Sequence, residues 1–168
     1  MLFKLLFENE SSTYTYLISC PDKKEAVLID PVIETVERDL HILKSLGLKL
    51  IYAIDTHIHA DHVTSASALR EITNCKVAGP ANDKLKCRDI NFRDNDSLTL
   101  GTSLEIKAFH TPGHTDTHFS YVLEHNERKI LFSGDALLID ACGRTDFQSG
   151  SSKELFNTIK KFFYLMPD

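Results

Sequence analysis

A dense group of metal-binding side chains separates an apolar segment from an amphipathic one. Residues 56–62 read Thr-His-Ile-His-Ala-Asp-His, so three imidazoles and one carboxylate fall within six residues. Residues 49–55 predict a buried strand and residues 63–73 a helix, which places the group at the carboxyl end of a strand, where α/β proteins form sites. Imidazole and carboxylate are common ligands of zinc and iron. We therefore predict metal binding rather than a polar loop, with candidate ligands His57, His59, Asp61 and His62.

Two other predicted strands also end in side chains that bind metals. The strand at 104–109 leads to His114, which directly follows Pro112-Gly113, a dipeptide that predicts a tight turn. The strand at 129–132 leads to Asp135. His57, His114 and Asp135 therefore form a set of ligand types at three strand ends, whereas His110 and His118 are expected to have structural or supporting roles.

The remaining patterns predict a mixture of strands and helices. Residues 81–97 are polar and predict a solvated loop. Asp30 precedes Pro31 at the end of a strand, so it either faces the site or forms a turn. Two further helices are expected. One covers residues 34–46 and stops before Gly47, and the other covers residues 153–165, with Ser151 or Ser152 as its N-cap. The expected strands cover 2–7, 14–20, 26–30, 49–55, 76–79, 98–100, 104–109, 119–124 and 129–132.

Length and composition favour one globular domain, residues 1–168. Hydrophobic residues make up 42% and charged residues 26%, and the chain is long enough for a sizeable core. The net charge of −5 argues against nucleic acid or an anionic membrane as the main partner. No apolar run approaches the ~20 residues of a membrane span, and the start resembles neither a secretory signal nor a transit peptide. We expect a cytoplasmic protein with reduced cysteines, of which Cys20 and Cys75 pack in the core.

The motifs THIHADH (56–62), TPGHT (111–115) and SGDALL (133–138), in this order, resemble the metallo-β-lactamase superfamily. The resemblance implies an α+β fold, an αββα sandwich with the metal site at one edge of its two sheets. The chain ends before a carboxyl-terminal portion that relatives usually carry, so we expect this fold in a truncated form. Residues 134–139 and 142–148, which include GRTDFQ, are most similar to the persulfide dioxygenase branch.

This resemblance implies one Fe(II) per chain, held by His57, His114 and Asp135, and the oxidation of glutathione persulfide by O2 to sulfite and glutathione. Two imidazoles and one carboxylate are also the ligand set of non-haem Fe(II) oxygenases. His59, Asp61 and His62 would orient these ligands or form a second metal site. Arg144 would bind a glutathione carboxylate, or else pair with Asp146 or Asp140. Cys142 would flank the substrate pocket, or else be buried in packing.

Two other functions stay open. The first is a zinc-dependent thioester hydrolase of glyoxalase II type, a hydroxyacylglutathione hydrolase, in which metal ions activate a water molecule. The second is a non-catalytic remnant that keeps the fold and the metal. The truncation would leave strand edges and apolar faces uncovered, so we also expect a homodimer.

Overall fold

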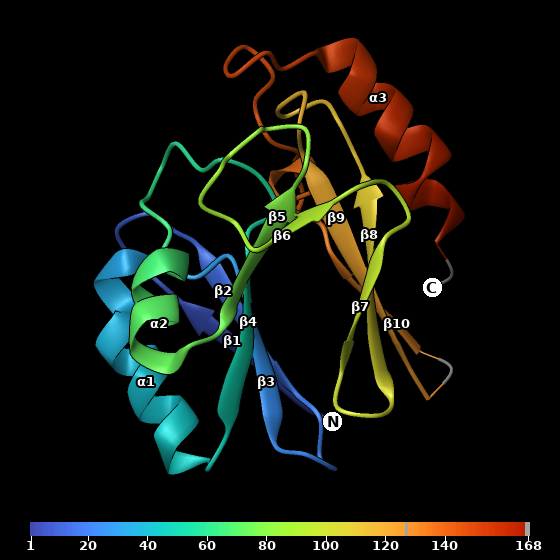
Figure 1. Ribbon diagram of the computed structural model, residues 1–168. Helices are drawn as coiled ribbons and strands as arrows, with labels where there is room; N and C mark the ends of the chain where they lie inside the picture. Colours follow the sequence, from blue (N-terminus) through green and yellow to red (C-terminus); the bar gives the residue numbers. More distant parts are fainter. Residues whose placement is uncertain (127, 167–168) are drawn as a thin grey trace.

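The computed structural model describes residues 1–126 and 128–166 and contains two β-sheets packed face to face (Figure 1). Helices α1 and α2, Val36–Ser45 and Ala66–Thr73, cover the outer face of one sheet, and α3, Ser152–Lys161, lies beside the other. The predicted αββα sandwich is therefore confirmed. No helix in the described part of the chain is both long and apolar enough to cross a bilayer.

The first sheet has six strands in sequential order. Its first three strands pair antiparallel through short turns, as the sequence predicted, and the later strands pair parallel. Helices α1 and α2 make the crossovers between parallel strands β3, β4 and β5. The strands are β1 Leu2–Phe7, β2 Tyr14–Ser19, β3 Glu25–Ile29, β4 Lys49–Ile54, β5 Lys76–Pro80 and β6 Ile90–Phe92.

The second sheet has four antiparallel strands in the order β10-β9-β8-β7. Short 3-10 turns precede α1 at Ile33–Thr35, follow the last strand at Gly134–Ala136 and follow α3 at Phe163–Leu165. The strands are β7 Ser97–Leu100, β8 Leu104–His110, β9 Phe119–His125 and β10 Arg128–Phe132.

The main core lies between the sheets, and smaller cores lie under the helices. Val27 and Ile29 of β3 face the opposite sheet, whereas Leu28 packs with Leu43 of α1 and Leu69 of α2. Strand β3 is thus buried on both faces, which explains why it reads as a continuous apolar run. Cys20 and Cys75 are also buried, as predicted.

Four elements differ from the prediction. The helix expected at 34–46 is preceded by a 3-10 turn at Ile33–Thr35 and is α-helical only over Val36–Ser45. Helix α2 begins at Ala66 rather than at residue 63, because Thr64 pairs with Val32 and its hydroxyl donates to Asp55 at 2.6 Å. The loop predicted at 81–97 contains β6, which adds to the sheet edge beside β5. The last helix ends at Lys161 and continues as the separate 3-10 turn, while Ser151 caps its start as expected.

Strand direction explains why the site lies at one edge of the sandwich. Strands β3 and β4 run parallel, so the segments after Ile29 and Ile54 leave the first sheet at the same edge. Strands β8 and β10 both run antiparallel to β9, so the segments after His110 and Phe132 also leave their sheet at a common edge. Segments far apart in the sequence therefore meet there.

Candidate metal centre

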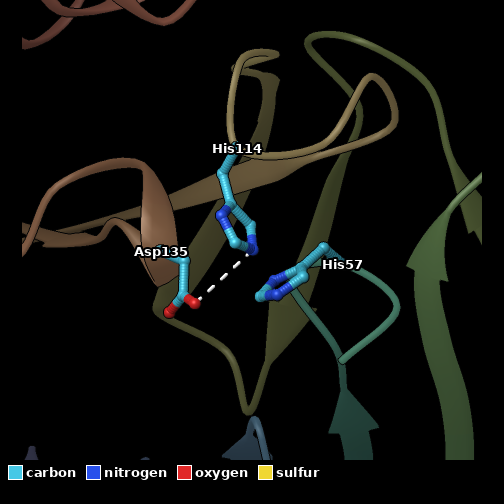
Figure 2. Close-up of side chains that lie close together, drawn as sticks. All are labelled: His57, His114 and Asp135. Atoms are coloured by element: carbon cyan, nitrogen blue, oxygen red, sulfur yellow. Dashed lines mark ion pairs between the residues drawn. The ribbon is translucent and has the colours of Figure 1, made fainter. Parts of the chain in front are cut away.

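His57, His114 and Asp135 converge at this edge (Figure 2). Each offers one ligand atom, and these atoms all lie within 4.8 Å of one another. Nε2 of His114 is 3.5 Å from a carboxylate oxygen of Asp135, and the rings of His57 and His114 lie 4.9 Å apart. Both imidazoles are buried and Asp135 is partly exposed. The structure thus brings together the three ligands that the strand ends predicted.

Asp30 holds the segment that carries His57. It accepts hydrogen bonds from the backbone N–H and the hydroxyl of Thr56, at 2.7 and 3.0 Å, and lies 3.1 Å from Nε2 of His59. Burial opposes ionisation of Asp30, but His59 and the hydrogen bonds from Thr56 outweigh it and lower the pKa of its carboxyl. Both interpretations of Asp30 are correct, because it faces the site and also has the left-handed φ of +51° that ends β3.

The charge balance differs between neighbouring imidazoles. Burial and the surrounding histidines hold the pKa of His57 well below its usual value, so this ring stays neutral and can donate a lone pair to a metal. Burial also disfavours the charged form of His59, but the carboxylates of Asp30, Asp55 and Asp61 raise its pKa to about 9. In the metal-free site, His57 is therefore prepared to bind a cation, whereas His59 binds a proton instead.

The segment after Asp135 holds the other two ligands. Nδ1 of His114 donates to the backbone carbonyl of Arg144 at 2.9 Å, which leaves Nε2 free to bind metal. The N–H of Gly143 donates to the carbonyl of Asp135 at 2.8 Å. A Cβ atom at Gly143 would lie 2.8 Å from Nδ1 of His114 and even closer to the Asp135 carbonyl. Only glycine fits at this position.

Helix α3 supports the turn that carries His114. Gly113 has a φ of +145°, and an added Cβ would overlap the backbone of Leu155. The N–H of Ser151 donates to the carbonyl of Gly113 at 2.8 Å, and the hydroxyl of Thr158 donates to the carbonyl of Pro112 at 2.7 Å. The tight turn predicted from Pro-Gly is therefore clamped against the start of the last helix.

A second cluster lies beside the first. The ligand atoms of His59, Asp61 and His62 also lie within 4.8 Å of one another. Thr13 Oγ1 is 3.1 Å from a carboxylate oxygen of Asp61 and 3.2 Å from Nδ1 of His62. Nε2 of His62 is buried with no hydrogen-bond partner among the described residues. This cluster suits either a second cation or the supporting role that the sequence left open.

The loop before β2 was not predicted to reach the site. Glu8 accepts hydrogen bonds from the backbone of Glu10 and Ser11 and from the Ser11 hydroxyl, and this fixes the loop that presents Thr13. The spacing of Glu8 and Ser11 indicates a local turn. It does not indicate that Thr13 contacts Asp61 and His62, about fifty positions later. Sequence alone therefore gave no signal for Thr13.

His118 lies behind the first ligand. It is fully buried, its ring stacks on His57 at 5.1 Å, and its Nδ1 is 2.9 Å from the hydroxyl of Thr111. Burial and the neighbouring His114 lower the pKa of His118 to about 3, so the ring is neutral. His110 lies further out, 2.9 Å from the carbonyl of Asp116. Both contacts agree with the supporting roles that we expected.

A cavity of about 600 Å³ opens onto both clusters. Arg144 lines the cavity, and its guanidinium donates two hydrogen bonds to Asp146, at 2.8 and 3.0 Å. In this structure Arg144 therefore forms the ion pair with Asp146 that we considered as an alternative to substrate binding. Cys142 is exposed and is not among the residues that line the cavity, so burial in packing is wrong for it. The lining residues include Thr13, Tyr14, Tyr16, Asp30, His59, Asp61, His114, Asp135, Leu138 and Phe147.

The sequence profile of the Metallo-beta-lactamase superfamily matches residues 9–164. This chain belongs to that superfamily. It is 42% identical to the mouse protein "Persulfide dioxygenase ETHE1, mitochondrial", over 99% of this chain and 65% of that protein. The fold is similar to that in the crystal structure of ETHE1 from Myxococcus xanthus, with a TM-score of 0.93 and 45% sequence identity. The match covers all of this chain and 72% of the Myxococcus xanthus chain. The resemblance to the persulfide dioxygenase branch is therefore confirmed.

The other branch is more distant. The cytoplasmic hydroxyacylglutathione hydrolase of Arabidopsis thaliana is 31% identical over 87% of this chain and 56% of that protein. This chain thus spans 65% of the curated ETHE1 relatives and a smaller share of the hydrolase. The expected truncation agrees with these lengths.

The donor set fits a transition metal. Two neutral imidazoles and one carboxylate suit Fe(II) and Zn(II), whereas Mg²⁺ and Ca²⁺ prefer oxygen ligands alone. Nδ1 of His57 and Nδ1 of His114 already have hydrogen-bond partners, so the remaining Nε2 atoms are available to a metal. The residues present therefore fit one divalent transition-metal ion.

Proposed function

We propose that this protein is a non-haem Fe(II)-dependent persulfide dioxygenase that oxidises glutathione persulfide with O2 to sulfite and glutathione. The observation that carries the proposal is the convergence of His57, His114 and Asp135 within 4.8 Å, since this is the ligand set of non-haem Fe(II) oxygenases. The similarity to proteins named persulfide dioxygenase, over 99% of this chain, supports the same reaction.

The three ligands would make different contributions to metal binding. A bound Fe(II) would supply the redox chemistry by which O2 reacts with the persulfide sulfur. His57 and His114 contribute neutral nitrogen donors from two buried rings, and burial keeps water away from that side of the site. Asp135 contributes a negative charge that offsets part of the charge of the divalent ion, and it faces the cavity where substrate would enter.

Arg144 gives the cavity a group that can recognise a carboxylate. Its present partner is Asp146, and both side chains are largely exposed, at 67% and 71%. An ion pair this exposed is screened by water and contributes little to stability, so a carboxylate of glutathione can replace Asp146. The planar guanidinium offers the same two-bond geometry to the substrate. We therefore keep Arg144 as the proposed substrate-binding residue, with Cys142 outside the cavity wall.

Oxygen uptake by the iron-loaded full chain tests the proposal. We expect O2 consumption with glutathione persulfide, formation of sulfite, and loss of both in Asp135→Asn, which removes the ligand charge. Asp116→Asn is the matched control, because Asp116 is exposed and is not one of the clustered ligands. No uptake by protein that contains one iron per chain would overturn the proposal.

The second candidate is a zinc-dependent thioester hydrolase. The cluster of His59, Asp61 and His62 favours it, because a two-metal site would bind and activate a water molecule for attack on a thioester. Metal analysis of freshly purified protein separates the two candidates. Iron near one per chain supports the dioxygenase, and zinc near two per chain with hydrolysis of a glutathione thioester supports the hydrolase. Turnover of either substrate would exclude the non-catalytic remnant.

We also propose a homodimer. Strand β1 lies at the edge of its sheet, and its apolar side chains Phe3, Leu5 and Phe7 are exposed, at 37%, 55% and 44%. An apolar edge strand favours pairing with another chain. Light scattering of the purified protein would give the mass of two chains, and the mass of one chain at all concentrations would contradict this. The cytoplasmic location stays a prediction.

A further inference from the structure

Thr56 lies between the carboxylate of Asp30 and the ring of His57. Its hydroxyl oxygen is 3.0 Å from Oδ2 of Asp30 and 2.9 Å from Nδ1 of His57, and its backbone N–H donates to Oδ1 of Asp30 at 2.7 Å. All three residues are at least 95% buried. Water therefore does not compete for these contacts, and each buried polar atom must find its hydrogen-bond partners among neighbouring protein groups. Asp30 Oδ1 has one further neighbour, Nε2 of His59 at 3.1 Å, whereas the only side-chain partner of Oδ2 among the described residues is the Thr56 hydroxyl.

The chemistry of the three groups fixes the direction of each bond. An ionised carboxylate only accepts hydrogen bonds, so the single hydroxyl proton of Thr56 goes to Asp30. The hydroxyl oxygen then has only lone pairs to offer to His57, so Nδ1 of His57 must carry a proton and donate it. A neutral imidazole has one N–H, which leaves the lone pair on Nε2.

The opposite tautomer of His57, with the proton on Nε2, is disfavoured for two reasons. If Nε2 of His57 carried the proton, Thr56 would have to donate to Nδ1, and Oδ2 of Asp30 would lose its hydroxyl donor in a buried site. The proton on Nε2 would also occupy the nitrogen that would otherwise bind a metal. Thr56 therefore decides whether His57 can act as a ligand.

The side chain of Thr56 is also held in place. Gly134, with a φ of +49°, packs so closely that an added Cβ would lie 2.7 Å from Oγ1 of Thr56 and 2.6 Å from Nε2 of His118. Gly134 immediately precedes the third ligand, Asp135. The backbone that presents Asp135 thus packs beside the hydroxyl that orients His57, and a side chain at position 134 would displace that hydroxyl.

We propose that Thr56 is a positioning residue, which couples His57 to Asp30 and thereby sets both the tautomer and the ring orientation of this metal ligand. The inference holds for iron or zinc alike and does not depend on the reaction proposed above. Groups that hold the remote nitrogen of a ligating histidine typically change metal affinity about 10–100-fold when they are removed.

Metal affinity in three variants tests the inference. Thr56→Val keeps the shape but removes the hydroxyl, and we expect about 10–100-fold weaker binding of Zn²⁺ and Co²⁺ in competition with a chromophoric chelator. Thr56→Ser restores the hydroxyl and should bind within a few-fold of the unchanged protein. Thr15→Val is the matched control, because Thr15 is equally buried and donates to the backbone carbonyl of Asp30 at 2.9 Å, away from the ligands. Binding by Thr56→Val that equals the unchanged protein, or an equal loss in Thr15→Val, would overturn the proposal.

A second measurement needs no variant. Long-range proton–nitrogen NMR of the metal-free protein at neutral pH reports which nitrogen of His57 carries the proton. The proposal predicts Nδ1–H, and a dominant Nε2–H form would contradict it even if Thr56→Val does not fold. The absorption spectra of the Co²⁺ forms of Thr56→Val and the unchanged protein add a test of ligand geometry. We expect the ligand-field bands to differ, whereas a merely structural role for Thr56 would leave them the same.

Discussion

The backbone carbonyl of Arg144 accepts a 2.9 Å hydrogen bond from Nδ1 of His114. The residue that the sequence assigned to substrate binding therefore also orients a metal ligand, through its main chain. The neighbouring N–H of Gly143 donates to the carbonyl of Asp135, so the segment holds two of the three ligands. The GRTDFQ segment, which resembles the persulfide dioxygenase branch, is thus part of the structure of the metal centre.

Gly143→Ala should damage the metal centre. The new Cβ would lie 2.8 Å from Nδ1 of His114 and overlap the carbonyl of Asp135, so one of these ligands must move. We expect at least about tenfold weaker Zn²⁺ or Fe²⁺ binding, as for loss of other groups that orient ligands. Ala141→Ser, two residues earlier and exposed, is the control. Equal metal affinity in both variants would show that the loop relaxes without effect.

Arg144→Gln should weaken substrate binding and leave the metal in place. The variant loses the guanidinium but keeps the carbonyl that holds His114. We expect the KM for glutathione persulfide to rise about tenfold, since a charge-assisted hydrogen bond to the substrate carboxylate is lost, with little change in kcat. Metal content should stay the same. A fall in kcat with an unchanged KM would instead assign Arg144 a role in the chemical step.

Glu8→Gln should destabilise the protein at neutral pH. Hydrogen bonds from the backbone of Glu10 and from Ser11 lower the pKa of Glu8 from 4.5 to about 2. A lowered carboxyl pKa stabilises the fold above the unfolded value of 4.5, and this contribution is lost as the pH falls from 4.5 towards 2. Urea unfolding should therefore separate the two proteins at pH 7 and bring their stabilities together near pH 2. A constant difference at every pH would argue against ionisation of Glu8 as the cause.

His118 should make the metal-free protein sensitive to mild acid. Its pKa is about 3 when folded and 6.5 when unfolded, so below pH 6.5 the unfolded chain binds a proton that the fold excludes. This group alone should reduce the free energy of unfolding by about 1.4 kcal/mol per pH unit between these values. In His118→Gln we expect lower stability at pH 7 but a shallower decline towards pH 4. Parallel declines would contradict the assignment.

The strand ends that carry the ligands could be predicted because each is an apolar run that leads through a short connecting segment to an imidazole or a carboxylate. His57, His114 and Asp135 needed only this local signal. Strand β6 could not be predicted, since its three residues are too short to show a period and it exists by pairing with β5. Propensity also failed at Thr64, where a bridge to Val32 replaced the first helical turn.

The contacts that complete the site are long-range and had no local signal. Thr13 meets Asp61 across 48 residues, and Thr56 meets Asp30 across 26. Asp30 was ambiguous because an aspartate before proline reads the same in a turn as at a site. The ligands of the centre were therefore visible in the sequence, while the contacts of Thr13 and Thr56 became visible only in the fold.

The most direct test of the proposed dioxygenase activity is O2 uptake with glutathione persulfide by the full chain, with the iron content measured on the same sample. We expect one iron per chain, O2 consumed and sulfite formed in equal amounts, and no uptake in Asp135→Asn. Protein that holds one iron per chain but consumes no O2 with this substrate would contradict it.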